Sequence, residues 1–206
     1  MVRTKALNGL LVGLVSSLAL LVGCGGGGGG GGGPDAASLT AEGWDHYEQG
    51  EYNDAIGKFD AAVEADPSYA DAYNGLGWSY GKLDSLAEAL ANFALCISNG
   101  GTGPEPYAGQ APVLRDLDPP QFSNAITAAT TALTKDSDFE FEHHEDFDWH
   151  DLHLIKAQCY FALADYTQAL AEVDILDPSN TIDPNASGFV TDLAEVIEDL
   201  EEDFGE

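Results

Sequence analysis

Basic side chains are scarce in this sequence. Its 206 residues include 7 Lys and Arg against 36 Asp and Glu, which gives a formal net charge of −29 at pH 7. A field of this sign repels nucleic-acid phosphates and anionic lipid surfaces, and it favours cations or basic partners. We therefore expect no nucleic-acid partner. A well-solvated surface suited to a salty environment is the simpler interpretation of the same charge.

Metal-site motifs are also absent. The sequence has no H-E-x-x-H and no pair of closely spaced cysteines, so it offers no closed metal site. The G-x-S-x-G spacing occurs once, at Gly77-Trp78-Ser79-Tyr80-Gly81, inside a predicted helix and not at the strand-to-helix turn that a nucleophile elbow requires, and we identify no nucleophile–base set. We therefore predict that the protein is not an enzyme and needs no cofactor. Cys96 and Cys159 occupy positions typical of small residues in helix packing, and we expect buried free thiols. An extracytoplasmic location would also permit a disulfide between them.

A long apolar run occurs at the N-terminus. Arg3 and Lys5 precede an apolar segment over residues 10–22, which is too short and wrongly flanked for a spanning helix and is typical of a secretory signal. The segment ends in Leu21-Val22-Gly23-Cys24, which resembles the lipobox of bacterial lipoproteins. The resemblance implies a signal peptide over residues 1–23, cleavage before Cys24, and acyl chains such as palmitate on that cysteine. A plain secretory signal with an incidental cysteine is the alternative.

A glycine-rich tether follows the predicted lipidation site. Residues 25–33 are all glycine and Pro34 ends the run. A glycine run has no side chains that could form a core, and it makes up most of residues 24–37. We interpret them as a flexible spacer between a lipid anchor and a folded domain.

The same pattern of glycine, alanine and phenylalanine occurs twice within residues 38–98. Gly43 and Gly77 are 34 residues apart, as are Ala55 and Ala89, and Phe59 and Phe93. A fixed period of this length is typical of stacked helical hairpins. The small residues allow two helices to approach closely, and the aromatic residues fill the remaining space. The spacing therefore predicts two antiparallel hairpins that need neighbours to cover their apolar faces.

This pattern resembles the tetratricopeptide repeat family. The resemblance implies an all-α fold, a short α-solenoid in which the first helices of successive hairpins line a groove that binds peptides or partner proteins. Carried over residue by residue, the groove positions of this sequence are polar or aromatic, and we predict that they bind a partner: Thr40, Trp44, Tyr47, Asp71, Asn74, Trp78 and Lys82.

Two interpretations of the tryptophans remain open. Trp44 and Trp78 are one period apart, so they should lie side by side on one surface. On the first interpretation this surface faces the partner, as interface tryptophans often do. On the second, both rings pack against the glycines of the neighbouring helix and belong to the core.

We interpret residues 99–151 as an insertion. Its glycines and prolines predict irregular structure over residues 99–120, and a helix should follow over residues 121–134. From residue 138, aromatic residues alternate with acidic ones on both sides of His143 and His144. This alternation predicts a small β-hairpin-like segment with one aromatic and one acidic face. The alternative is that residues 138–153 bind a divalent cation through His143, His144, His150 and His153.

The repeat returns in degenerate form over residues 152–206. Ala157, Tyr160 and Ala169 keep the skeleton of the pattern. A last amphipathic segment follows, with Leu193 and Leu200 on its apolar side, and it predicts a C-terminal capping helix.

These observations lead to one functional hypothesis and one alternative. The first is a scaffold that is anchored by lipid in the bacterial cell envelope, in the outer membrane and facing the periplasm or the surface, and that holds a protein or peptide partner. The alternative is a lipoprotein that binds a divalent cation or a small ligand through residues 138–153.

Overall fold

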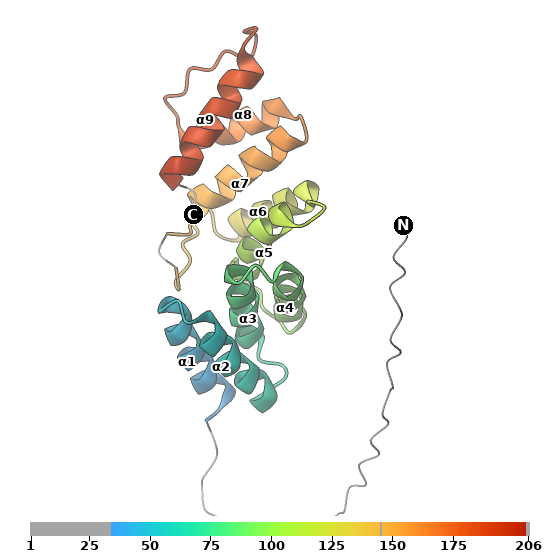
Figure 1. Cartoon of the computed structure of the whole chain (residues 1–206), viewed down its shortest axis with the longest axis vertical. Helices are drawn as coiled ribbons and strands as arrows, with labels where there is room; N and C mark the ends of the chain where they lie inside the picture. The colour runs from blue at the N-terminus through green and yellow to red at the C-terminus, as the bar shows by residue number, and fades with distance from the viewer. Residues whose placement is uncertain (1–33, 145, 205–206) are drawn as a thin grey trace, which may run out of the picture. The chain divides into compact units, whose positions relative to one another are not determined.

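The computed structural model describes residues 34–144 and 146–204. The predicted signal peptide, Cys24 and the glycine run lie outside these residues. The described part contains nine α-helices (Figure 1). They are α1 (Ala36–Glu48), α2 (Tyr52–Ala65), α3 (Ala70–Lys82), α4 (Leu86–Ser98), α5 (Glu105–Asp116), α6 (Phe122–Lys135), α7 (Trp149–Ala162), α8 (Tyr166–Leu176) and α9 (Phe189–Phe204).

The first eight helices form four helical hairpins. Helix α1 packs against α2, α3 against α4, α5 against α6 and α7 against α8, and each hairpin contacts the next one. The first helices also contact one another, α1 with α3, α3 with α5 and α5 with α7. Helix α9 covers α7 and α8. This arrangement confirms the predicted all-α solenoid and its capping helix. No helix among the described residues combines the length and apolarity needed to cross a membrane.

Close approach of the hairpins depends on glycines around two buried phenylalanines. A Cβ atom added at Gly43 or Gly75 would overlap the ring of Phe59, and one added at Gly77 would overlap the ring of Phe93. Both phenylalanines are fully buried. Each ring therefore occupies space that a glycine on a neighbouring helix leaves open, which is the complementarity that the repeat predicted.

The prediction of irregular structure over residues 99–120 is wrong, because α5 lies within it. Pro106 falls in the first turn of α5, where a backbone N–H would have no acceptor within the helix, so its absence costs no helical hydrogen bond. Pro112 lies inside the helix and removes one backbone hydrogen bond. Burial of Ala108, Ala111 and Val113 against the neighbouring helices offsets that loss. The predicted insertion therefore contains a complete third hairpin, and the predicted third repeat is the fourth hairpin.

The predicted β-hairpin is replaced by a loop over residues 136–148, which we name the covering loop. Among its described residues, one isolated antiparallel bridge joins Glu140 to Asp148, and no strand extends from it. Turn-type hydrogen bonds interrupt the pairing, since the N–H of Phe147 donates to the carbonyl of His144. The loop nevertheless has the predicted aromatic side and acidic side. The aromatic residues Phe139, Phe141 and Phe147 are buried, whereas the acidic residues Glu140, Glu142 and Asp146 are exposed.

Candidate partner-binding face

The covering loop lies against the first helices of two hairpins (Figure 1). The ring of Phe141 stacks on Trp78 of α3, with centroids 4.0 Å apart and planes at 18°. Two residues along the loop, the imidazole of His143 stacks on Trp44 of α1 at 3.9 Å and 6°. Phe141 also meets Trp44 edge-on at 6.0 Å. One short segment therefore spans equivalent positions of successive repeats.

The predicted open surface of Trp44 and Trp78 is not present, because the loop covers both rings. Trp44 is 5% exposed and Trp78 is 6% exposed. On its other side each ring packs edge-on against the large aromatic residue of its own hairpin, Trp44 against Phe59 and Trp78 against Phe93. The tryptophans thus share one face of the first helices, as predicted, and they also belong to the core. We call the part of α1 and α3 under the loop the first-helix face.

The other predicted partner-binding residues surround the two tryptophans. Thr40 and Tyr47 of α1 and Asn74 of α3 are buried. Tyr47 lies beside Phe141, with ring centroids 6.1 Å apart. Lys82, at the end of α3, contacts the loop directly, and its Nζ is 3.2 Å from His144 Nε2. No contact with another molecule tests these residues, so their role in partner binding stays a prediction.

Carboxylates surround the imidazole of His143. Its Nδ1 is 2.8 Å from Glu48 Oε1 of α1. Asp71 at the start of α3 accepts a hydrogen bond from Trp44 Nε1–H at 3.4 Å. Although Asp71 is partly open to solvent, loss of hydration raises its pKa, and the Trp44 hydrogen bond and the charge of His143 oppose this rise. The face is therefore aromatic in its centre and acidic beside Trp44.

Some polar atoms of the first-helix face are buried without a partner. Among the described residues these include Thr40 Oγ1, Asn74 Oδ1 and Trp78 Nε1. An unsatisfied buried donor or acceptor costs about 1–3 kcal/mol. The covering loop therefore fills the face with good aromatic contacts but leaves hydrogen-bonding capacity unused.

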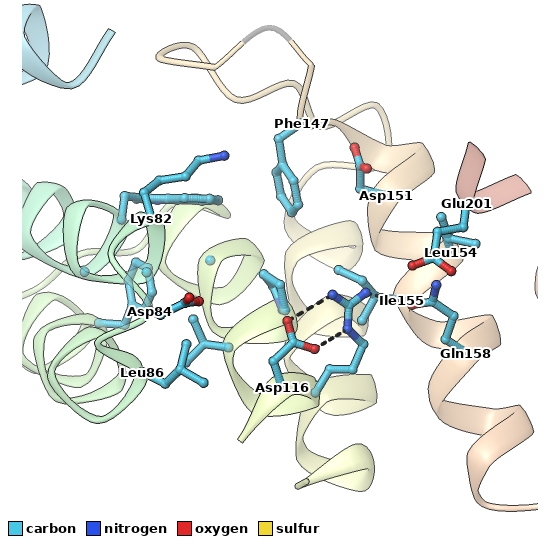
Figure 2. Close-up of a pocket in the computed structure, with 18 residues that line it drawn as sticks. Lys82, Asp84, Leu86, Asp116, Phe147, Asp151, Leu154, Ile155, Gln158 and Glu201 are labelled. Atoms are coloured by element: carbon cyan, nitrogen blue, oxygen red, sulfur yellow. Dashed lines mark hydrogen bonds and ion pairs between the residues drawn. The ribbon is translucent and has the colours of Figure 1, made fainter. Parts of the chain in front are cut away.

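A cavity of about 350 Å³ continues from this face towards the C-terminal hairpin (Figure 2). Trp78, Arg115 and Phe147 line it, together with residues of α7 and Glu201 of α9. The Arg115 guanidinium donates from Nε to Asp116 Oδ1 at 2.7 Å and from Nη1 to Gln158 Oε1 at 2.7 Å. These bonds hold the guanidinium against the walls of the cavity.

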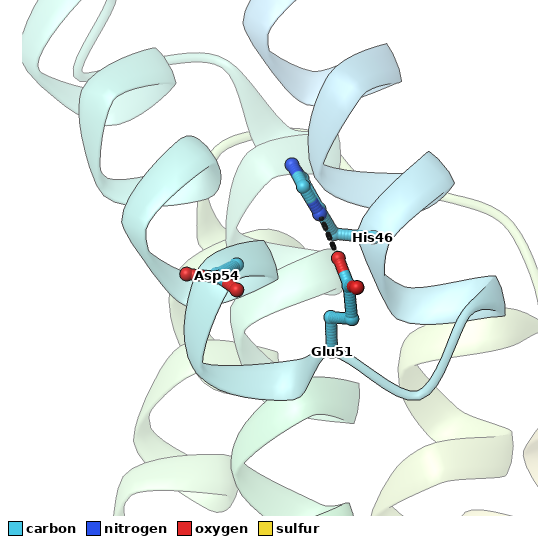
Figure 3. Close-up of side chains that lie close together, drawn as sticks. All are labelled: His46, Glu51 and Asp54. Carbon is cyan, nitrogen blue, oxygen red and sulfur yellow. Dashed lines mark hydrogen bonds and ion pairs between the residues drawn. The ribbon is translucent and has the colours of Figure 1, made fainter.

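The histidines of the proposed cation site do not converge. His143 pairs with Glu48, His150 with Asp148 and His153 with Glu172, while His144 lies beside Lys82. Within the described part of the chain, one group of three potential metal ligands comes together, His46, Glu51 and Asp54 (Figure 3). His46 Nδ1 is 2.6 Å from Glu51 Oε2, and Glu51 and Asp54 are exposed. The geometry of residues 138–153 thus gives no support to a cation site there.

The two cysteines of the helical domain are buried and free, as predicted. Burial raises the pKa of Cys96 to about 12 and that of Cys159 to about 11. A thiol with a raised pKa is a poor nucleophile at neutral pH. Both side chains therefore serve as small packing residues.

Sequence reasoning misses the residues that cover the face. It places Phe141, His143 and Phe147 in an inserted hairpin with no position relative to the repeats. The alternation of aromatic and acidic residues contains the relevant signal, because an aromatic face needs an apolar surface to cover it. Trp44 and Trp78, predicted to lie side by side on the repeats, provide that surface.

The arrangement of the described residues defines a class, the helical-repeat solenoids with a face of aromatic residues on their first helices. Residues 40–102 match the family model described as "Tetratricopeptide repeat". No curated protein sequence matches the chain.

Several solved structures share the fold. One is YrrB, described as a TPR protein with an unusual peptide-binding site, with a TM-score of 0.62, 18% identity, and coverage of 82% of this chain and 88% of that one. Another is PilW, a type IV pilus biogenesis factor, with a TM-score of 0.58, 14% identity, and coverage of 81% of this chain and 78% of that one. A third is a thermophilic TPR protein from Thermus thermophilus, with a TM-score of 0.54, 16% identity, and coverage of 82% of this chain and 83% of that one. At these identities the likeness concerns the fold alone.

Proposed function

We propose that the protein is a lipid-anchored scaffold of the bacterial cell envelope, which captures a protein or peptide partner on its first-helix face. One observation carries the proposal: Trp44 and Trp78 lie on one face of successive first helices and accept the aromatic side chains of one short loop segment. A surface that already holds such a segment has the shape and the chemistry to hold another one.

The properties of the face support peptide capture. Buried tryptophans are frequent among the residues that contribute most to binding energy. The unpartnered atoms of Asn74 and Trp78 offer an acceptor and a donor that the backbone of an extended segment can satisfy. The solved structure of YrrB is described as having a peptide-binding site, which supports this use of the fold.

Site-specific photo-crosslinking tests partner capture. A photoreactive amino acid replaces Asp71, on the first-helix face, or Glu88, exposed on the outer helix α4. We expect the full-length protein with the probe at position 71 to form a crosslink to a distinct envelope protein or peptide, and the protein with the probe at position 88 to form none. Equal crosslinking at both positions, or crosslinking at position 88 alone, contradicts the proposal.

The anchor is proposed from Leu21-Val22-Gly23-Cys24. Several acyl chains on Cys24, at about 0.8 kcal/mol for each buried methylene, would hold the protein firmly at a membrane. The Cys24→Ala variant should then lose palmitate labelling and leave the membrane fraction. The Cys96→Ala variant is the matched control and should keep both properties. Equal labelling of the wild type and the Cys24→Ala variant contradicts the anchor.

A further inference from the structure

The covering loop shows which side chains the first-helix face accepts. Phe141 and His143 point inward at alternate positions and stack on Trp78 and Trp44. The intervening Glu142 is exposed. The N–H of His144 donates to the carbonyl of Phe141 at 3.0 Å, so residues 141–144 form a turn. Within this turn the side chains of Phe141 and His143 reach both tryptophans with one residue between them.

The position occupied by His143 has three features that select a planar cation. The Trp44 ring lies parallel to the imidazole at 3.9 Å. The carboxylate of Glu48 is 2.8 Å from Nδ1. Asp71, which accepts a hydrogen bond from Trp44, interacts electrostatically with the imidazole of His143. A guanidinium satisfies all three features better than imidazole does, because it is always charged, stacks on indole and donates to carboxylates along a planar edge.

The charge of the whole chain favours the same occupant. The acidic residues Glu140 and Glu142 of the loop are exposed to solvent and do not contribute to the contacts with the face. A partner segment therefore does not need acidic residues at these positions. The net charge of −29 attracts basic segments and repels acidic ones. The loop belongs to the same chain, which gives it a high effective concentration at the face, so it can occupy the face without carrying the best-matched charge.

On the basis of the proposed function, we infer that the partner is a segment that can adopt a turn like that of residues 141–144, in which an aromatic residue is followed, two positions later, by arginine. The covering loop is its built-in competitor. The aromatic side chain of the partner replaces Phe141 on Trp78, and its guanidinium replaces His143 between Trp44, Glu48 and Asp71. The partner must displace the loop, so its affinity for the intact protein is lower than its affinity for the uncovered face.

Three labelled peptides with the sequence of residues 137–144 provide the test. They carry the natural His143, the His143→Arg change or the His143→Glu change. Fluorescence anisotropy measures their binding to the full-length wild type in detergent and to the full-length His143→Ala variant, which has lost the contacts of the His143 side chain with Trp44 and Glu48. Far-ultraviolet circular dichroism verifies the fold of the variant.

We expect the Arg peptide to bind the His143→Ala variant about tenfold or more tightly than the Glu peptide does, since the stack and the ion pairs are present only in the first case. The same order, with weaker binding, is expected for the wild type, which keeps the test decisive if the variant does not fold. Glu48→Gln should reduce the preference for the Arg peptide, and Glu64→Gln, an exposed change on the outer helix α2, should not.

Equal binding of the Arg and Glu peptides, or no binding of the Arg peptide to either protein, overturns the inference. If position 71 nevertheless crosslinks to an envelope protein, partner capture stands and only the chemistry assigned to the partner is wrong. If no crosslink forms at position 71 and no peptide binds either protein, partner capture itself fails. The two experiments therefore separate the two failures.

Discussion

Phe141 of the covering loop stacks on Trp78 of α3 with ring centroids 4.0 Å apart. This contact connects the loop that precedes the fourth hairpin to the second hairpin. It accounts for the burial of a tryptophan whose other neighbours are the rings of Phe93 and Phe147. The first-helix face is therefore both a part of the core and the candidate binding surface.

The coupling between these two rings is measurable. Trp78→Ala and Phe141→Ala should each lower the free energy of unfolding by about 3–5 kcal/mol, because each removes a large buried ring. The double variant should lose less than the sum of the two, by about 0.5–1.5 kcal/mol. Each single variant already removes the stacking energy between the two rings, so the second substitution cannot remove it again. Chemical denaturation of the four proteins gives this difference. Strict additivity would show that the loop and α3 do not stabilise each other.

Glycine substitutions test the packing between hairpins. Gly75→Ala should destabilise the protein by about 1–3 kcal/mol, because the added methyl group would overlap the ring of Phe59. Gly57 lies in α2 with no atom within 4 Å of an added Cβ, so Gly57→Ala should stabilise by up to about 1 kcal/mol through helix propensity. Thermal melts of the two variants should move in opposite directions. A shift of the same sign in both would contradict the packing described here.

The turn after α7 contains a strained residue. Ala164 has a φ of 59°, a left-handed conformation that disfavours a side chain with Cβ. Gly50 occupies the matching turn of the first hairpin with a φ of 74°. Ala164→Gly should therefore raise the free energy of unfolding by up to about 1 kcal/mol. Ala162→Gly, at the end of α7, is the control and should lower it, and denaturant midpoints distinguish the two results.

A buried ionic cluster predicts a dependence on pH. Glu172 of α8 is 6% exposed and lies 2.6 Å from His153 Nδ1 and 2.8 Å from Lys156 Nζ of α7. Burial alone would raise the pKa of Glu172, but hydrogen bonds from His153 and Lys156 outweigh it and lower that pKa from 4.5. The ionised carboxylate therefore stabilises the fold at neutral pH, and this contribution is lost as the pH falls below about 4.5 through the lowered pKa.

Glu172→Gln should thus cost about 3–5 kcal/mol at pH 7, because it leaves Lys156 buried and without its carboxylate. The difference from the wild type should shrink as the pH falls below 4.5. Glu198→Gln on the exposed side of α9 is the control, with an expected effect near zero. Urea denaturation at several pH values measures both, and a cost that is independent of pH would contradict the assigned ionisation.

Much of the fold could be predicted from the sequence, because the pairs Gly43 with Phe59 and Gly77 with Phe93 report local packing at a fixed spacing. Helix α5 was missed since Pro112 argues against a helix by itself, and only burial against α4 and α6 outweighs it. The covering of Trp44 and Trp78 could not be predicted either. It depends on a contact between segments that are distant in the chain, and no local period encodes that contact.

Hydrogen exchange of the covering loop tests the central claim most directly. The N–H of Phe141 donates to the carbonyl of Phe147 at 3.0 Å, and the N–H of Trp149 donates to that of Phe139 at 2.8 Å. If a partner occupies the first-helix face, it must displace the loop, so these two amides should exchange faster in the complex while amides of α1 and α3 become better protected. Unchanged or slower exchange of the loop amides in the presence of bound partner would contradict the account.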